Sequence, residues 1–447
     1  MGKKSSTVAA GRGAGGTARS VPPQPPPRAT NTHRRAAQRR ETGFAFFTRA
    51  VANAPAVAIQ SLTAVPGKNA PPPLLYADTD HSADALYFGN VHVPDAFIAF
   101  GRRGRKYAVV SALEFSRVKK ASSFEVVLPL EPWLRRARET WPQRQAGAAE
   151  VIYLLAREHH QTRFTVPEDF PSGLYERLFE LGLDLSVAEG ELFPARETKS
   201  AAETAAIREG NRCSARGLAA AERILRRSEI RGRRLVFEGR TLTSERLRFA
   251  VETACLEAGA VPAHTIVAGG DQACDPHERG SGPLRPHELV IVDVFPRVAA
   301  TGFHGDMTRT FLRGRASDRQ RALVAAVRGA QRSALGKVRA GVKGRTVHEQ
   351  VVGFFRDRGF ETQTTPRGPE GFFHGTGHGL GLAVHEAPRI GATAEGRLRR
   401  HAVVTVEPGL YYPGLGGCRI EDVVQITTLG SRLLSRYSYQ WEFQTRA

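Results

Sequence analysis

The sequence predicts an α+β protein with two folded domains behind a basic tail. Residues 1–71 are rich in Gly, Ala, Ser, Pro and Arg, which separates them from the rest of the chain. Short apolar runs alternate with segments of helical spacing up to about residue 193, and longer helices separated by apolar strands follow. A chain of 447 residues is long enough to bury more than one core.

The first 71 residues are the predicted disordered tail. Their composition, including the proline-rich run 22–27, cannot bury enough apolar surface to offset the entropy lost on folding. They carry eleven Lys and Arg against one acid, Glu41, and thus half of the net charge of +20. Because the remaining charge forms no stripe, we expect no nucleic-acid partner. The same basic, acid-poor composition also fits an organelle transit peptide.

The cysteines and the apolar runs bear on the compartment. The four cysteines contain no CxxC pair, so neither a disulfide framework nor a cysteine zinc site is expected, and a reducing compartment fits. No apolar run approaches the ~20 residues that a membrane helix needs. The N-terminus lacks the apolar stretch of a secretory signal. We therefore expect a cytoplasmic protein with no membrane partner.

Residues 72–193 are expected to form a small α/β domain. Short apolar runs bounded by Gly, Asp and Arg predict strands, and two segments have helical spacing. The expected strands are 74–77, 96–100 and 107–110, and the helical segments are 131–160 and 170–182. This alternation is typical of an α/β domain that ends near residue 193.

Residues 194–447 are expected to form the second domain. Four segments have helical spacing, and they cover residues 197–228, 244–258, 317–339 and 345–358. Thr243 and Ser244 are candidate caps of the second of these helices, and Gly259 ends it. Strand segments lie between the helices, and they carry the candidate catalytic and metal-binding residues.

Three acidic residues occupy positions where a strand should be apolar. Asp293 lies inside the run 289–295, Glu407 follows Val403–Val406, and Glu421 precedes Asp422-Val423-Val424. An unpaired buried carboxylate is very costly, so each needs a partner. A salt bridge or a strand end facing water explains any one of them, but three in one domain need a shared positive partner. Asp306 adds a fourth, because a hairpin can bring it opposite Asp293.

A glycine-rich segment adds histidines to this set. Residues 374–386 contain His374, His378 and His385, with glycine at four positions between 375 and 381. A zincin site requires a helix, and the four glycines disfavour a helix in this segment. The glycine spacing of a dinucleotide-binding loop is also absent. Four carboxylates and one imidazole form a hard, oxygen-rich set that favours manganese, and four negative charges balance two divalent ions.

These motifs together resemble a known family. In order they are Asp293 in its apolar strand, Asp306-x-Thr-Arg-Thr-Phe, His374-Gly-x-Gly-His-Gly-x-Gly-x-x-x-His-Glu-x-Pro, Val406-Glu-Pro-Gly-Leu-Tyr and Arg419-Ile-Glu-Asp. The set resembles the pita-bread metallopeptidases, and most of all aminopeptidase P and prolidase. The resemblance covers about residues 196–430. Residues 74–193 resemble, more weakly, the creatinase-type N-terminal domain of that family.

The resemblance implies a role for each matching residue. Asp293 would bind one metal ion, Asp306 and Glu421 would bridge both, and His378 and Glu407 would complete the second. Glu407 would also accept the proton of the nucleophilic water. The other implied residues are His385 at the developing oxyanion, the substrate-binding His277, His374 at the proline pocket, and Arg419, which orients the acids beside it.

The implied activity is hydrolysis of Xaa-Pro bonds in short peptides by a water that two divalent ions activate, Mn²⁺ being preferred and Co²⁺ or Zn²⁺ possible. The choice between aminopeptidase P and prolidase stays open, and a non-enzymatic pita-bread binding protein is the alternative. The additional N-terminal domain implies a homo-oligomer, a dimer or larger.

The sequence departs from the family pattern in two places. Asp293 and Asp306 are thirteen positions apart, two more than is usual in the family, and Phe303 stands where many members have Tyr. Side chains alternate faces along a strand, so an insertion of two residues preserves facing. We therefore expect a longer turn and an intact site.

Overall fold

The structure is a computed structural model that describes residues 71–444. The predicted disordered tail, apart from Pro71, lies outside the described residues. Within residues 71–444, no helix combines the length and the apolar character needed to cross a bilayer.

The N-terminal domain is built on a four-stranded sheet in the order β1-β2-β3-β4, whose strands are antiparallel except for the parallel pair β3 and β4. Its strands are β1 (Leu74–Ala77), β2 (Phe97–Arg102), β3 (Arg105–Val110), β4 (Val126–Pro129) and the separate parallel pair β5 (Arg163–Val166) and β6 (Asp184–Val187). Its helices are α2 (Ala83–Gly89), α3 (Ala112–Ala121), α4 (Leu130–Thr140), α5 (Ala148–Glu158) and α6 (Ser172–Glu180). The predicted strands are present, whereas the domain limits 72–193 and 194–447 stay predictions.

The helical spacing expected over residues 131–160 belongs to two helices, so that expectation was too simple. Helix α4 ends at Thr140, and Pro142 follows. A proline restricts the residue before it to extended conformations and has no N–H to donate to a helix. Gly147 then stands as the N-cap of α5, and its N–H donates to Glu150 Oε2 at 2.8 Å.

Two sheets form the framework of the C-terminal part. The first has the order β11-β12-β14-β24 and the second the order β18-β17-β19-β22-β23. The strands of the first are β11 (Ile266–Gly269), β12 (Leu289–Val294), β14 (Met307–Arg313) and β24 (Glu442–Phe443). Those of the second are β17 (Gly377–Gly379), β18 (Glu386–Ile390), β19 (Val403–Val406), β22 (Asp422–Ile426) and β23 (Ser431–Leu433).

The remaining elements connect or cover these sheets. The helices are η1 (Pro194–Glu197), α7 (Ala201–Arg227), α8 (Ser244–Glu257), η2 (Gly270–Cys274), α9 (Asp318–Lys337) and α10 (Gly344–Arg356). The strands are β7 (Glu229–Arg231), β8 (Arg234–Phe237), β9 (Arg240–Thr241), β10 (Ala260–Val261), β13 (Arg297–Val298), β15 (Gln363–Thr365), β16 (Gly368–Glu370), β20 (Gly409–Tyr412) and β21 (Gly416–Arg419). The four predicted long helices correspond to α7, α8, α9 and α10, with ends that differ by a few residues.

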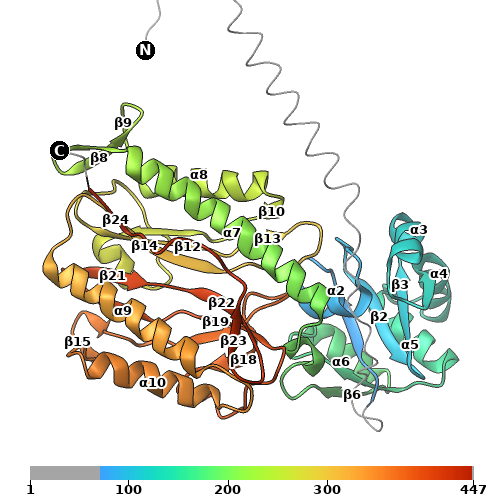
Figure 1. Cartoon of the computed structure of the whole chain (residues 1–447). Coiled ribbons are helices and arrows are strands. Elements are labelled where there is room, and N and C mark those ends of the chain that lie inside the picture. Colours follow the sequence, from blue (N-terminus) through green and yellow to red (C-terminus); the bar gives the residue numbers. More distant parts are fainter. Residues whose placement is uncertain (1–70, 445–447) are drawn as a thin grey trace, which may run out of the picture. The chain divides into compact units, whose positions relative to one another are not determined.

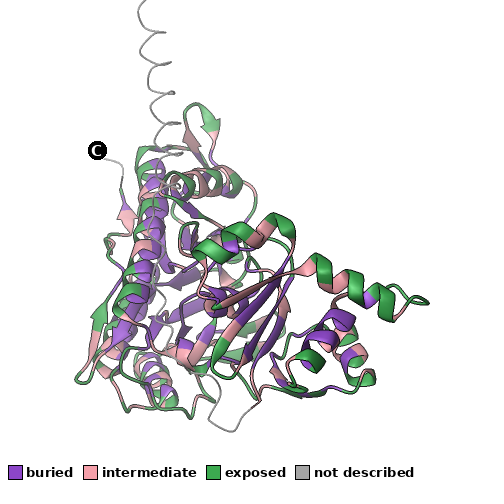
Figure 2. Cartoon of the chain, turned by 90° about the vertical axis from the view of Figure 1, so that its right-hand side faces the viewer, coloured by how far each residue is buried: buried purple, intermediate pink, exposed green. Residues whose placement is uncertain are grey.

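Each sheet is covered by a pair of helices (Figure 1). Leu218 of α7 and Leu247 of α8 lie in one apolar cluster with Val292 of β12. Val327 of α9 and Val351 of α10 belong to another with strands of the second sheet. Strands are mostly buried, whereas helices expose their outer faces (Figure 2). The helices therefore shield the outer faces of the two sheets, and side chains on the opposite faces are left to build a site.

Candidate metal centre

The first sheet places two aspartates on one face. Strands β12 and β14 are antiparallel, and Asp293 lies opposite Thr308. Asp306 precedes β14 and is two residues from Thr308, so the alternation of side chains directs both to the face of Asp293. Between the two acids the chain makes a turn, in which Gly302 has a φ of +75°. The two acids therefore lie on the same face of the sheet, thirteen positions apart in the sequence.

Helix α7 fixes the segment before Asp306 by close backbone contact. A Cβ at Gly210 would lie 2.4 Å from Gly305 N, and a Cβ at Gly305 would lie 2.1 Å from Gly210 C. Only glycine at both positions permits this approach. Next to it, Asp306 N–H donates to Asn211 Oδ1 at 3.2 Å, and the buried Asn211 amide donates to Ile207 O at 3.0 Å. The helix therefore holds the backbone that carries Asp306.

The second sheet contributes His378, Glu407 and Glu421. His378 lies in β17, Glu407 follows β19, and Glu421 precedes β22, whose Asp422 pairs with Val406. Thr405 Oγ1 accepts from His378 N–H at 3.0 Å and donates to Glu407 Oε1 at 3.2 Å. The Thr405 hydroxyl therefore fixes the position of Glu407 relative to His378.

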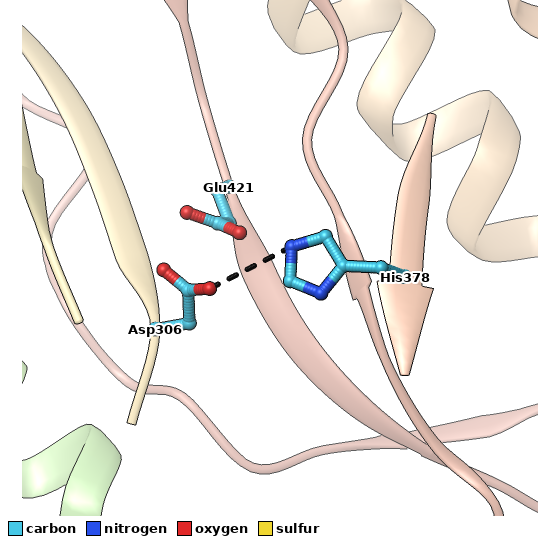
Figure 3. Close-up of side chains that lie close together, drawn as sticks. All are labelled: Asp306, His378 and Glu421. Atoms are coloured by element: carbon cyan, nitrogen blue, oxygen red, sulfur yellow. Dashed lines mark ion pairs between the residues drawn. The ribbon is translucent and has the colours of Figure 1, made fainter. Parts of the chain in front are cut away.

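The side chains from the two sheets meet (Figure 3). Ligand atoms of Asp306, His378 and Glu421 all lie within 4.8 Å of one another. His378 Nε2 is 3.7 Å from Asp306 Oδ2 and 3.3 Å from Glu407 Oε1. Thr308 Oγ1 lies 2.8 Å from both Asp293 Oδ1 and Glu421 Oε2. The structure thus brings together all five residues predicted as metal ligands, and their roles as ligands stay predictions.

The electrostatics of this group favour an added cation. Burial, followed by neighbouring carboxylates, raises the pKa of Asp306 and of Glu421 well above the usual values. Burial opposes a charge on His378, but the hydrogen bond to Glu407 and the nearby acids raise its pKa to about 9. The group therefore attracts positive charge. A carboxylate-rich set with one imidazole fits a divalent cation of the manganese type.

Arg419 connects this group to the predicted substrate-binding His374. Its Nη2 donates to Asp293 Oδ2 at 2.8 Å, and its Nη1 donates to Tyr411 Oη at 3.0 Å. Tyr411 Oη is in turn 2.9 Å from His374 Nε2. Tyr411 is fully buried, and sequence reasoning gave it no role although it stands in the quoted Val-Glu-Pro-Gly-Leu-Tyr motif. Sequence reasoning also gave no role to Thr308 and Thr405.

The five candidate ligands line a cavity of about 880 Å³ together with His277, His374, His385 and Arg419. His385 lies on the cavity wall, and its ring stands perpendicular to that of His378, with centroids 4.4 Å apart. Burial and then the charges of His378 and Arg389 lower the pKa of His385 to about 4, so its imidazole is neutral near pH 7. The cavity wall also includes Arg389, Phe372, Phe373 and His348, which sequence reasoning did not assign.

Known proteins match both the sequence and the fold. The Xaa-Pro dipeptidase of Pyrococcus furiosus is 32% identical over 173 residues, which are 38% of this chain and 47% of that protein. The probable dipeptidase PepE of Mycobacterium tuberculosis is 37% identical over 170 residues, 38% of this chain and 43% of that protein. The chain thus spans about half the length of these curated relatives.

Two solved structures show the likeness of fold. Prolidase from Pyrococcus furiosus has a TM-score of 0.68 at 22% identity, and the match covers 83% of this chain and 97% of that one. X-Pro aminopeptidase from Thermotoga maritima has a TM-score of 0.68 at 22% identity, covering 84% and 98%. The predicted pita-bread fold with an N-terminal domain is confirmed. The sequence profile of metallopeptidase family M24 matches residues 205–428, half of the sequence, and the chain belongs to that family.

Proposed function

We propose that this protein is a metal-dependent exopeptidase that hydrolyses Xaa-Pro bonds in short peptides. The observation that carries the proposal is the convergence of four carboxylates and His378 in one cavity of about 880 Å³. Cavities of ~300–1,000 Å³ suit small ligands, and a short peptide belongs to that class. The dipeptidases and the X-Pro aminopeptidase to which the chain is similar support the same reaction.

The metal ions would be held by both sheets. Asp293, Asp306, His378, Glu407 and Glu421 would hold these ions, with Mn²⁺ preferred over Co²⁺ or Zn²⁺ because oxygen ligands predominate. Divalent ions bound there would supply Lewis acidity and lower the pKa of coordinated water.

The protein's own groups would orient the substrate and move the proton. Glu407 faces the cavity, and Thr405 and His378 fix its carboxylate, so it is the group placed to accept a proton from water. The neutral His385 would donate a hydrogen bond to the carbonyl oxygen as negative charge develops there. His277 is the further substrate-binding group, and its exposed side chain lies on the cavity wall.

The cavity also offers surfaces for both sides of a proline bond. Phe372 and Phe373 provide apolar wall next to His374, which suits a proline ring. Among the described residues, Arg389 makes no ion pair although it lines the cavity. A guanidinium in this position is suited to a carboxylate, and the C-terminal carboxylate of a dipeptide is the nearest such group in a short substrate.

Replacement of Arg389 by methionine is expected to raise KM for Xaa-Pro dipeptides by about 10- to 100-fold with little change in kcat. The reason is the loss of a charge-assisted hydrogen bond worth about 1.5–3 kcal/mol. KM for Xaa-Pro amides, which lack the carboxylate, should not change. Arg400→Met removes an exposed arginine outside the cavity wall and serves as the matched control. An equal rise of KM for acids and amides would contradict this assignment.

The proposed function is tested with a peptide panel. The protein is treated with a chelator and then given Mn²⁺, and hydrolysis of Xaa-Pro, Xaa-Pro-Yaa and proline-free peptides is followed by chromatography. Metal-dependent cleavage of the Xaa-Pro bond is expected. Cleavage of dipeptides alone would select a prolidase, and release of Xaa from the longer peptides would select an aminopeptidase. No cleavage with metal bound would favour the non-enzymatic alternative. The homo-oligomer and the cytoplasmic location stay predictions.

A further inference from the structure

One buried carboxylate next to the cavity belongs to no ligand set described above. Glu386 is 3% exposed, and it follows the predicted catalytic His385 directly in the chain. Lys199 Nζ donates to its Oε1 at 2.6 Å, and Arg196 Nη2 donates to its Oε2 at 2.5 Å. Arg196 Nη1 donates at the same time to Asp84 Oδ1 at 2.6 Å. Arg196 Nη1 also lies 3.6 Å from Oε2 of Glu191. Three acids and two cations therefore form one ion cluster, which we call the Glu386 cluster.

The chain around residue 381 is shaped to admit this carboxylate. A Cβ at Gly381 would lie 2.1 Å from Glu386 Oε1, so a side chain there would displace the acid. Gly381 N–H donates to Ala383 O at 3.1 Å, and Gly381 O accepts from His304 N–H at 2.8 Å. The loop 380–385 therefore folds around the carboxylate, and the position of Glu386 determines the path of the loop.

His385 depends on this loop for its orientation. Within residues 71–444, its ring makes a contact with the ring of His378 and no hydrogen bond that would fix it. Its direction into the cavity is therefore set by the backbone between Gly381 and Glu386. An imidazole that donates a hydrogen bond to a developing oxyanion must be placed to a fraction of an ångström. The backbone that carries His385 must therefore be held in position by nearby residues.

The charges of the cluster fit an anchor better than a source of stability. Burial raises the pKa of Glu386, but the charges of Lys199 and Arg196 outweigh this effect and leave that pKa below its ordinary value. Taking such ions out of water is costly, and apolar replacements of buried ion pairs are often more stable. Such ion pairs instead fix the distance and the orientation between the groups that they join. Here they fix the start of β18 relative to α2, which carries Asp84.

We propose that Arg196 and Lys199 are positioning residues that hold His385 in place through Glu386, and that Asp84 extends this control to helix α2 of the N-terminal domain. The catalytic consequence rests on the proposed function, whereas the anchoring of loop 380–386 does not. The N-terminal domain therefore contributes to the geometry of the catalytic loop through two ion pairs, Asp84–Arg196 and Arg196–Glu386.

Arg196→Met tests the proposal through backbone hydrogen exchange of the full chain, measured without metal and without substrate. Exchange of the amides between 380 and 386 should rise by about tenfold or more, with no change in β12 and β19. Asp84→Asn, which leaves Arg196 and Glu386 paired, should have a smaller effect in the same direction. If Arg196→Met does not fold, Asp84→Asn and Arg196→Lys decide the question. Unchanged exchange in the loop of these variants would overturn the proposal.

Kinetics on an Xaa-Pro peptide separate positioning from general damage. Arg196→Met should lower kcat by about 10- to 100-fold, as is typical when a supporting residue of a site is lost, with KM changed less than about twofold. In a His385→Ala background, Arg196→Met should lower kcat no further, because it acts through His385. Additive losses would overturn the proposal.

The matched control is Arg177→Met, which breaks the ion pair of Arg177 with the buried Glu150 inside the N-terminal domain, at 3.0 Å. It should lower stability but leave both loop exchange and kcat unchanged. A wild-type protein that cleaves no Xaa-Pro peptide would refute the proposed function, and the exchange experiment would still decide whether the cluster anchors the loop.

Discussion

Replacement of Asp306 by asparagine is expected to abolish Xaa-Pro hydrolysis and, at the same time, to stabilise the metal-free protein. Activity should fall on the order of a thousandfold, about 4 kcal/mol of transition-state stabilisation, because a proposed shared metal ligand is lost. Stability should rise because burial and neighbouring acids disfavour the charged form of Asp306. Each kcal/mol relieved raises Tm by about 2–4 °C.

The measurement is thermal unfolding with and without Mn²⁺. In the wild type, a saturating ion stabilises by about 2.7 kcal/mol at a hundred times Kd, and this gain should be absent in the variant. Asp318→Asn makes the same chemical change at a fully exposed side chain and should leave activity and the Mn²⁺ effect intact. A variant at position 306 that melts lower without metal and still responds to Mn²⁺ would show that the ion binds elsewhere.

Replacement of Asp422 by alanine should cost about 3–5 kcal/mol of unfolding free energy, the largest loss of stability that we expect from a single change. This fully buried carboxylate accepts four hydrogen bonds. The donors are Arg309 Nη2 at 2.9 Å, Gln331 Nε2 at 2.8 Å, Ser435 Oγ at 2.7 Å and Tyr439 Oη at 2.8 Å. Alanine would leave the buried Arg309 guanidinium without its counter-ion, and an uncompensated buried charge is very unfavourable.

Urea unfolding monitored by fluorescence measures this loss. Asp422→Asn keeps the shape of the side chain and some acceptor capacity, so its loss should be smaller than that of alanine. Asp357→Ala is the control, because Asp357 is exposed and pairs with the exposed Arg356 at 3.3 Å, and it should change stability by less than about 1 kcal/mol. Equal losses for Asp422→Ala and Asp357→Ala would mean that the network behind Glu421 does not support the fold.

The acids in apolar strands were predictable because their cost is a local property of the sequence. Asp293 stands between Val292 and Val294, and these neighbours alone show that its carboxylate needs a partner. The face to which Asp306 points was predictable too. Side chains alternate between the two faces of a strand, so an insertion of two residues leaves Asp306 on the same face as Asp293. Both arguments need only the location of a strand and the two-residue alternation of its side chains, and both can be recognised in the sequence.

The ion cluster and the cavity arginine were not predictable in this way. Glu386 was visible only as part of the His-Glu pair in the glycine-rich motif, and its partners lie 190 and 187 positions away. Pairing between distant charges follows from how domains and loops meet in space, and no periodicity reports it. Arg389 lies in strand β18 and is exposed, and no motif in the sequence singles it out. The end of helix α4 at Thr140 was not predicted, because the apolar residues keep a helical spacing across Pro142.

The parallel pairing of β14 with β24, together with the contacts of Ser435 and Tyr439 with Asp422, has a consequence for biosynthesis. The strand that follows Asp306 and the segment that follows Glu421 both depend on residues made more than a hundred positions after β14. A nascent chain that has just completed the glycine-rich loop would still lack half of this framework. We therefore expect the proposed metal site to form only after residues 435–443 have left the exit tunnel.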